Sequence, residues 1–270
     1  MTEKTFLDEE TEKHAECQRI LILPDIHIPF HDQRAIDLVE KVAVAFSPHI
    51  LVQLGDLLNL DQFSKHLSRP AELDSVARDL ESGYELLRRM DCWCSGRRIF
   101  IEGNHEVRAR DWAWEKCAIL TGTDCDPVNL VRRGLQIDKL GWEYVPYHRA
   151  IRIGKIYFTH DLGFSGKYAT AQTLDCANHS IVIGHTHRLS CHTIGDPLRP
   201  GSVKGCYSFG WLGDTKRLLR ANPYFHELRA ARDWALGFGL GYLHTSGIVY
   251  FMQIPVINYG CIVEGSVFRA

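Results

Sequence analysis

Short apolar runs that end abruptly in polar residues set the pattern of this chain. The runs are rich in Ile, Val and Leu, and small or polar residues bound them, which is typical of buried β-strands. We therefore predict five strands, at residues 20–24, 50–54, 98–102, 156–159 and 181–183. Each is followed within two residues by Asp, Asn or His. In open α/β sheets, functional side chains gather at the carboxyl ends of the strands.

Other stretches carry apolar residues at helical spacing or show turn signals. Residues 33–46 predict a helix that Asp32 can cap. Gly154 indicates a tight hairpin between strands 150–153 and 155–158. Further helices are predicted over 72–90, 106–120, 168–178 and 226–236, and further strands over 190–194, 203–209, 239–243, 248–254 and 259–268.

Strand–helix–strand units come early in the chain and hairpins come late. This order predicts an α/β fold in which two sheets pack face to face with helices outside them. We expect the residues after position 187 largely to complete the second sheet. Core packing is the expected role of four tryptophans, namely Trp112, Trp114, Trp211 and Trp234; a position at the border of the pocket is the alternative for Trp211 and Trp234.

Composition is that of an ordinary globular protein, with 270 residues, 45% hydrophobic and 24% charged. Residues 1–18 are polar and predict an N-terminal arm, and residues 19–270 predict a single domain. The formal net charge of −2 favours no global attraction to nucleic acid, so any such binding needs a local patch. No apolar run predicts a membrane span or a secretory signal. The 9 cysteines predict reduced thiols, and cytoplasmic residence follows as the default.

The polar residues at the strand ends form one set of candidate metal ligands: Asp25, His27, Asp56, Asn104, His160, His185 and His187. His185 and His187 are two residues apart, so in an extended chain they would point the same way and reach the same place. Seven mixed oxygen and nitrogen donors are more than one tetrahedral zinc ion can bind, and they suit two divalent ions. Two ions about 3.5–4 Å apart can supply a hydroxide and clamp a phosphoryl group for in-line displacement. His105, beside Asn104, is not needed as a ligand and can serve the leaving oxygen.

These blocks and their order resemble the calcineurin-like metallophosphoesterases, in the style of compact phage or bacterial enzymes. The resemblance rests on Asp25-x-His27, Gly55-Asp56, Gly103-Asn104-His105-Glu106, His160 and Gly184-His185-Thr186-His187. It implies a four-layer α/β/β/α sandwich with a binuclear metal site. The metals would be manganese first, with iron, zinc, nickel or magnesium as alternatives.

The resemblance also implies individual roles. Asp25, His27 and His187 would hold the first metal. Asn104, His160 and His185 would hold the second, and Asp56 would bridge the pair. His105 would be the acid near the leaving group. The sequence Gly55-Asp56-Leu57-Leu58-Asn59 departs from the Gly-Asp-x-x-Asp-Arg-Gly of the protein serine/threonine phosphatases, which disfavours a phosphoprotein substrate.

Three functional hypotheses follow. The first is a two-metal phosphoesterase acting on a phosphomonoester or phosphodiester of a nucleotide or nucleic acid. The second is an exonuclease or endonuclease of the DNA-repair exonuclease type, in which His66, Arg69 and Arg108 contact the substrate phosphates. Lys65, Arg110, Arg132 and Arg133 could add to them, although scattered basic residues are commonly just solvated surface. The third is a non-catalytic scaffold. No hypothesis involves a membrane, and the sequence does not indicate the oligomeric state.

Overall fold

A six-stranded sheet is centred on β1 (Gln18–Leu23), the first strand of the chain. The computed structural model describes residues 17–65, 69, 73–123, 126–222 and 231–270. The order of this first sheet is β11-β10-β1-β2-β3-β4, with β1 to β4 parallel and β10 and β11 antiparallel. Its other strands are β2 (Ile50–Gln53), β3 (Arg97–Ile101), β4 (Glu143–Val145), β10 (Gly237–Leu243) and β11 (Val249–Pro255).

A second sheet has five strands in the order β5-β6-β7-β9-β8. β6, β7 and β9 run parallel, and β5 and β8 are antiparallel to their neighbours. The strands are β5 (Ile151–Ile153), β6 (Ile156–Phe158), β7 (Ile181–Ile183), β8 (Leu189–Gly195) and β9 (Val203–Phe209). The predicted hairpin at Gly154 is confirmed, because β5 and β6 pair across it.

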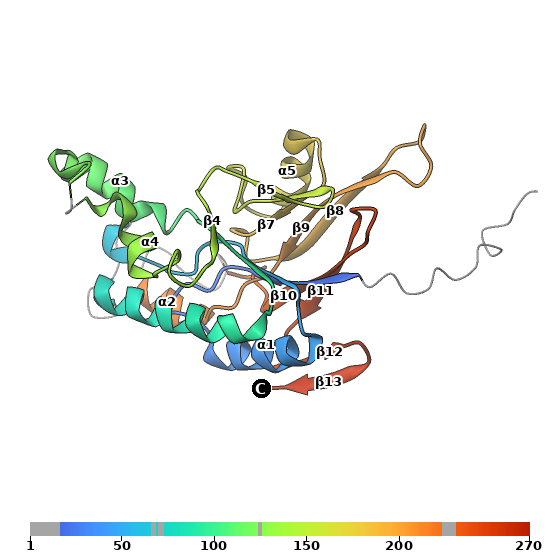
Figure 1. Ribbon diagram of the computed structural model, residues 1–270, viewed down its shortest axis with the longest axis horizontal. Coiled ribbons are helices and arrows are strands. Elements are labelled where there is room, and N and C mark those ends of the chain that lie inside the picture. The colour runs from blue at the N-terminus through green and yellow to red at the C-terminus, as the bar shows by residue number, and fades with distance from the viewer. Residues whose placement is uncertain (1–16, 66–68, 70–72, 124–125, 223–230) are drawn as a thin grey trace, which may run out of the picture.

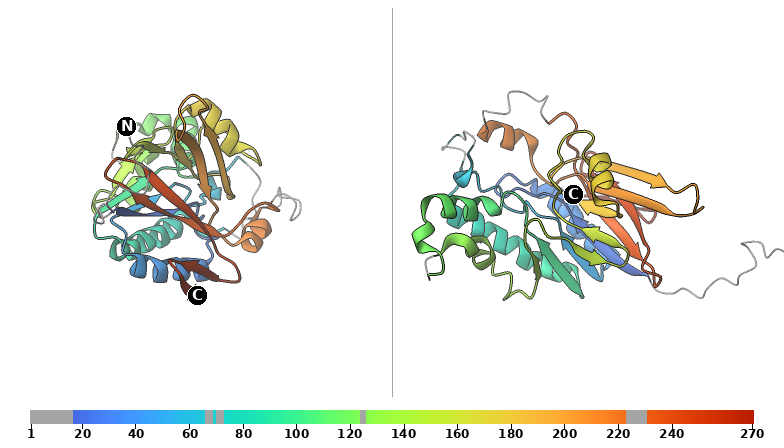
Figure 2. Two further views of the ribbon diagram at one scale, coloured as in Figure 1. Left: turned by 90° about the vertical axis from the view of Figure 1, so that its right-hand side faces the viewer. Right: turned by 90° about the horizontal axis from the view of Figure 1, so that it is seen from above.

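Helices cover the outer faces of both sheets, with α1 and α2 on one side of the molecule and α5 on the other (Figures 1 and 2). Asp32 caps α1 by accepting hydrogen bonds from the backbone amides of Arg34 and Ala35, as predicted. The helices are α1 (Gln33–Phe46), α2 (Val76–Met90), α3 (Val107–Lys116), α4 (Leu130–Gly134), α5 (Ala169–Ala177) and α6 (Thr215–Ala221). Among the helices of the described residues, none has both the length and the apolarity that crossing a membrane requires.

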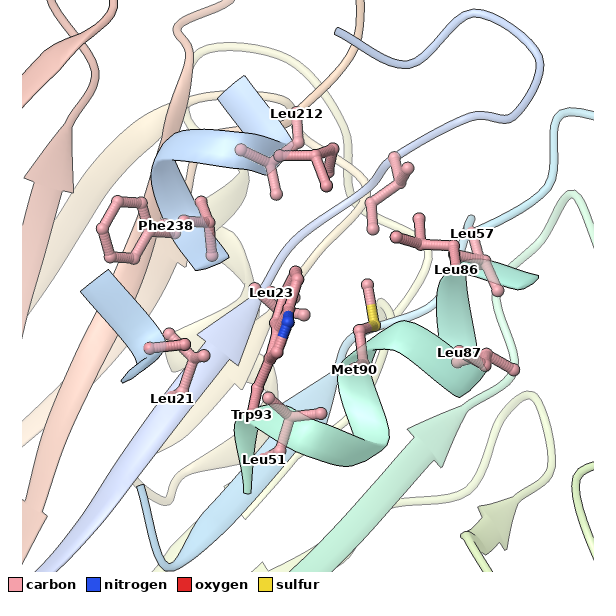
Figure 3. Packing of buried hydrophobic residues seen from close by; sticks show 14 of the residues in the cluster. Leu21, Leu23, Leu51, Leu57, Leu86, Leu87, Met90, Trp93, Leu212 and Phe238 are labelled. Carbon is pink, nitrogen blue, oxygen red and sulfur yellow. The ribbon is translucent and has the colours of Figure 1, made fainter. Parts of the chain in front are cut away.

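Alternate side chains of β1 point to opposite faces of the first sheet and belong to two separate parts of the hydrophobic core. Leu21 and Leu23 face the helix layer, where they pack with residues of α1 and α2 (Figure 3), whereas Ile20 and Ile22 face the second sheet. Phe158 and other residues of the second sheet meet them there, and a smaller cluster lies under α5. The layers are therefore helix, sheet, sheet and helix, which confirms the predicted four-layer sandwich.

The late strands differ from their prediction. Among the described strands after residue 187, β8 and β9 complete the second sheet, whereas β10 pairs with β1 and β11 pairs with β10 in the first sheet. Residues 259–268 form part of a separate two-stranded hairpin, β12 (Gly260–Val263) and β13 (Ser266–Arg269). Periodicity predicts a strand but does not select the neighbour with which it pairs.

Two further expectations fail in part. Within the helix predicted over 226–236, residues 223–230 lie outside the described residues, and residues 231–236 form a turn and an isolated bridge rather than a helix. Trp112 and Trp114 are 39% and 52% exposed, so they are not core residues. Of the predicted arm, only Cys17 and Gln18 are described, and Gln18 already belongs to β1.

Candidate metal centre

The loops that follow β1, β2, β3, β6 and β7 bring the predicted ligands together. The first cluster contains Asp25, His27 and His187. Asp25 Oδ2 lies 2.9 Å from His187 Nε2 and 3.8 Å from His27 Nε2. The two imidazole Nε2 atoms are 2.9 Å apart. Three donor atoms thus surround one point, although they come from loops far apart in the chain.

The second cluster is built around Asn104. Its Oδ1 atom lies 2.9 Å from His160 Nε2 and 2.7 Å from His185 Nδ1. Asp56 connects the two clusters, because its Oδ2 atom is 3.3 Å from His160 Nε2 and 3.8 Å from His27 Nε2. The structure therefore brings all seven predicted ligands together, with Asp56 facing both groups.

Hydrogen bonds on the far side of two imidazoles show that these donors suit metal ions. His27 Nδ1 donates to Asn59 Oδ1 at 3.0 Å, and His160 Nδ1 donates to the backbone oxygen of Leu54 at 2.7 Å. With a metal bound, each ring would direct an unprotonated Nε2 into the centre. Asp25 Oδ2 is buried and accepts no hydrogen bond from the described residues, so a cation there would satisfy it.

Electrostatics also favour cations at this centre. Burial opposes ionisation of Asp56, but the neighbouring His160 outweighs it and holds the pKa of that carboxyl well below its ordinary value. Burial opposes protonation of His160, yet Asp56 and other carboxylates raise its pKa to about 10. The buried carboxylates therefore create a negative potential, which divalent ions would neutralise.

The backbone at the ligands is not extended, which corrects one expectation. His27, Asp56, His185 and His187 have φ angles of 57°, 51°, 63° and 56°. These left-handed conformations cost roughly 1–3 kcal/mol each and cluster at functional sites. His185 and His187 therefore do not reach the same place: His187 joins Asp25, whereas His185 joins Asn104.

Comparison with known proteins agrees with this geometry. A family model for the calcineurin-like phosphoesterases matches residues 18–240. The chain belongs to this family. No curated protein sequence matches the chain significantly.

Solved structures similar to this calcineurin-like phosphoesterase share little sequence with it. Vps29 from Chaetomium thermophilum is 15% identical, covering 93% of this chain and 97% of that chain, with a TM-score of 0.45. Vps29 from Entamoeba histolytica complexed with zinc is 14% identical over 93% and 96% of the two chains, with a TM-score of 0.44. The phosphoesterase YfcE from E. coli is 13% identical over 87% and 99%, with a TM-score of 0.39.

Glycines allow the ligand loops of this family member to approach closely. A Cβ atom on Gly103 would lie 2.2 Å from Asp56 Oδ1, and one on Gly55 would lie 2.6 Å from His160 Nδ1. Gly55 also has a φ angle of 97°, which disfavours other residues. Both glycines are therefore required for the ligands to meet.

Two residues that hold the site received no role from the sequence. Glu106 is buried and accepts hydrogen bonds from the backbone amides of Asp56, Leu58 and Gly103. Burial and the nearby Asp56 raise the pKa of Glu106 to about 7. Asn59 orients His27 through its side chain and His105 through its backbone oxygen. For Glu106, the sequence feature that could have predicted this role is its place at the end of Gly-Asn-His-Glu. No sequence feature predicted the role of Asn59.

His105 lies at the edge of the centre, with its Nε2 atom 3.8 Å from Asp56 Oδ2. Its Nδ1 donates to the backbone oxygen of Asn59 at 2.7 Å, and its Nε2 accepts from Arg108 Nη2 at 2.9 Å. Burial chiefly, with help from Arg108, lowers the pKa of His105 well below its ordinary value. In this arrangement the imidazole is neutral.

The predicted substrate contacts separate into three cases. Arg108 lines a cavity of about 370 Å³ together with His27, Asp56 and His105. Arg69 is exposed and is not among the described residues that line this cavity. His66 lies outside the described residues. Arg110 and Arg132 form ion pairs with carboxylates, so these side chains are already partnered.

Aromatic side chains form one wall of the centre. The ring of Trp211 is 1% exposed and stacks on His187 with centroids 4.9 Å apart, so its predicted core position is confirmed. Trp234 meets His187 edge-on at 4.4 Å and lines the cavity, which differs from the core role expected for it.

Proposed function

We propose that this calcineurin-like phosphoesterase is a two-metal hydrolase of phosphate esters, acting on a nucleotide or nucleic-acid phosphoester. The observation that carries the proposal is the convergence of seven donors. Asp25, His27 and His187 form one group, Asn104, His160 and His185 form the other, and Asp56 lies within 4 Å of His27 and His160. In this proposal Asp25, His27 and His187 hold one metal ion, and Asn104, His160 and His185 hold the other. When bound, such an ion pair supplies a nucleophile from water at neutral pH and stabilises the developing charge on phosphorus.

The chain's own residues orient the reaction. Asn59 and the Leu54 carbonyl fix the imidazoles of His27 and His160, and Glu106 holds the loop that carries Asp56. We assign His105 to the leaving oxygen because it lies beside Asp56 and both its ring nitrogens already have partners, in Asn59 and Arg108. For His105 to donate a proton, its Nε2 must carry one. Arg108 must then turn away, because two N–H groups cannot hydrogen-bond to each other.

A nucleotide fits the cavity better than a small inorganic ester does. Leu218 and Trp234 add apolar surface to the lining, next to the metal centre. Its volume of about 370 Å³ is in the range of pockets that enclose drug-sized ligands. A nuclease has weaker support, because the described arginines Arg110 and Arg132 are paired with carboxylates. We also propose a cytoplasmic location, with which the free thiols of all eight described cysteines agree.

The proposal is tested by reconstituting metal-depleted protein with manganese, iron, zinc, nickel or magnesium in turn. Hydrolysis of p-nitrophenyl phosphate and bis-p-nitrophenyl phosphate is then measured. We expect hydrolysis to require metal. We also expect manganese to be the best activator. Asp56→Asn and His185→Ala should abolish it, whereas His179→Ala, at an exposed position outside both clusters, should not. Full activity in the first two variants would refute the proposal, and a failure to retain any ion would favour the scaffold hypothesis.

A further inference from the structure

Two arginines line the cavity beside the metal centre, and they differ in how their charge is balanced. Arg108 donates from Nη1 to Asp61 Oδ1 at 2.8 Å, and the carboxylate of Asp61 is 2% exposed. Asp61 is held in turn by Asn222, whose Nδ2 donates to Oδ2 at 3.3 Å. The charge of Arg108 is therefore neutralised within the protein.

Arg188 has no such partner among the described residues. Its guanidinium donates from Nη1 to the backbone oxygen of Thr186 at 2.8 Å. No carboxylate of the described residues lies within 4.0 Å of the guanidinium, and its buried Nε has no acceptor among them. A buried donor without an acceptor is unfavourable, and an anion from outside the chain would satisfy both the charge and the donor.

The position of Arg188 is fixed by its neighbours. Its backbone amide donates to Thr186 Oγ1 at 3.3 Å, and this hydroxyl is paired with Ser208 Oγ at 2.6 Å. Its backbone oxygen accepts from the amide of Gly210. Arg188 also directly follows His187, a member of the first cluster. The guanidinium is thus held at the cavity wall next to the metal centre, which reduces the conformational entropy lost when it binds a ligand.

We propose that Arg188 binds a second anionic group of the substrate, separate from the phosphoryl group that is cleaved. This inference rests on the proposed function, in which the metal clusters hold the phosphoryl group that reacts. The cavity has room for more than one phosphoryl group. The substrate class is therefore a nucleotide with at least two phosphates, such as a nucleoside polyphosphate or an oligonucleotide.

Matched substrate pairs test the proposal in the metal-loaded protein. Thymidine monophosphate and diphosphate form one pair, and the thymidine dinucleotide and trinucleotide, with one and two internal phosphates, form the other. We use whichever of the two pairs the protein hydrolyses. For the member with two phosphates, Arg188→Gln should lower kcat/KM by about 10- to 100-fold through an increase in KM. For the member with one phosphate, kcat/KM should stay within about twofold of the parent value. Arg188→Lys should lose less. Arg199→Gln, at a position that is 82% exposed, is the control.

A binding measurement gives a readout that does not depend on hydrolysis. Fluorescence anisotropy would follow a fluorescein-labelled thymidine trinucleotide bound to the metal-loaded His105→Asn variant, in which turnover is expected to be slow, at several salt concentrations. Arg188→Gln should reduce the slope of log K against log salt by about 0.7, the value for one lost contact with single-stranded nucleic acid. Equal losses on both members of a pair, no loss on either, or an unchanged slope would overturn the proposal.

The failure of this inference is distinguishable from failure of the proposed function. Hydrolysis that requires metal but is indifferent to Arg188 would refute only the role of Arg188. Absence of hydrolysis with every metal would refute the proposed function and, with it, the substrate class assigned to Arg188. Thermal unfolding of Arg188→Gln and Arg188→Lys, compared with the control, shows whether a loss comes from misfolding.

Discussion

The carboxylate of Glu106 accepts a hydrogen bond from the backbone amide of Asp56 at 2.9 Å. The same oxygen accepts from Gly103 at 2.8 Å, and the other oxygen accepts from Leu58 at 2.8 Å. One buried side chain thus ties the loop after β2 to the loop after β3. Asp56, which faces both clusters, is therefore positioned by an acid that is in neither cluster.

Replacing this acid should loosen the centre without removing a ligand. Glu106→Gln substitutes an N–H₂ group for one acceptor and leaves at least one buried amide unpaired. We expect a loss of about 1–3 kcal/mol in the free energy of unfolding, together with weaker metal retention. Urea unfolding and metal analysis measure the two effects. Glu115→Gln, which changes a carboxylate that is 53% exposed on α3, is the control and should show neither. Unchanged stability in Glu106→Gln would contradict the positioning role.

Removal of metal should destabilise the protein. Without cations, the buried carboxylates of Asp25 and Asp56 have only imidazoles nearby to neutralise their negative charges. Ions that bind only the folded chain stabilise it by about 2.7 kcal/mol at 100 times Kd. We expect Tm to fall on addition of a chelator and to recover with added manganese, by scanning calorimetry. In Asp56→Asn the shift should be smaller. An identical Tm with and without chelator would count against a metal centre.

Asp79 should make stability depend on pH. It lies on α2, is 1% exposed, and accepts a hydrogen bond from Gln62. Burial raises its pKa from 3.8 to about 6, so the folded state holds the proton more tightly than the unfolded state. Its effect on the free energy of unfolding is therefore neutral below pH 4, becomes increasingly unfavourable between pH 4 and 6, and levels off above pH 6. The full loss is up to about 3 kcal/mol.

Asp79→Asn removes this penalty and keeps an acceptor for Gln62. We expect the variant to be more stable than the parent at pH 8 and similar to it at pH 4, as measured by urea unfolding at both pH values. Glu81→Gln, at an exposed position on the same helix, is the matched control. A gain that is the same at both pH values would show that ionisation of Asp79 is not its cause.

Arg108 and Asp61 should be energetically coupled. Arg108→Met leaves the buried carboxylate of Asp61 without its cation, and breaking such a pair typically costs about 3–5 kcal/mol. Part of this loss should be recovered in the double variant with Asp61→Asn, because the unpaired charge is then absent. A double-mutant cycle from unfolding free energies measures the coupling. Strict additivity would show that the two side chains act independently.

His105 should affect turnover without affecting metal content. His105→Asn removes the imidazole beside the leaving oxygen, and general acid catalysis typically contributes about 10²–10⁴-fold. We expect kcat on thymidine monophosphate, whose alkoxide leaving group needs a proton, to fall within that range, while metal analysis still finds the parent's content. His179→Ala should change neither quantity. Loss of metal in His105→Asn would instead indicate a ligand role, since His105 also lies near His27 and Asp56.

Much of the fold and the ligand set could be read from the linear pattern. Apolar runs predicted the central strands because burial on both faces needs continuous apolar residues. The polar residues after these runs predicted the site, because parallel strands place their carboxyl ends at one edge of the sheet. Their types also indicated cations, since Asp, Asn and His are metal-binding side chains. These inferences need only local sequence and general geometry.

Tertiary structure alone decided the remaining features, because each depends on contacts between distant parts of the chain. β10 pairs with β1 because it packs against the first sheet, and the apolar periodicity of a strand does not specify its neighbour. Left-handed conformations at His185 and His187 send adjacent ligands to different clusters. Glu106 and Asn59 acquire their roles from backbone atoms that only the folded chain brings near them. Likewise, the sequence shows that Arg188 carries a charge, but only the fold shows that no described carboxylate neutralises it.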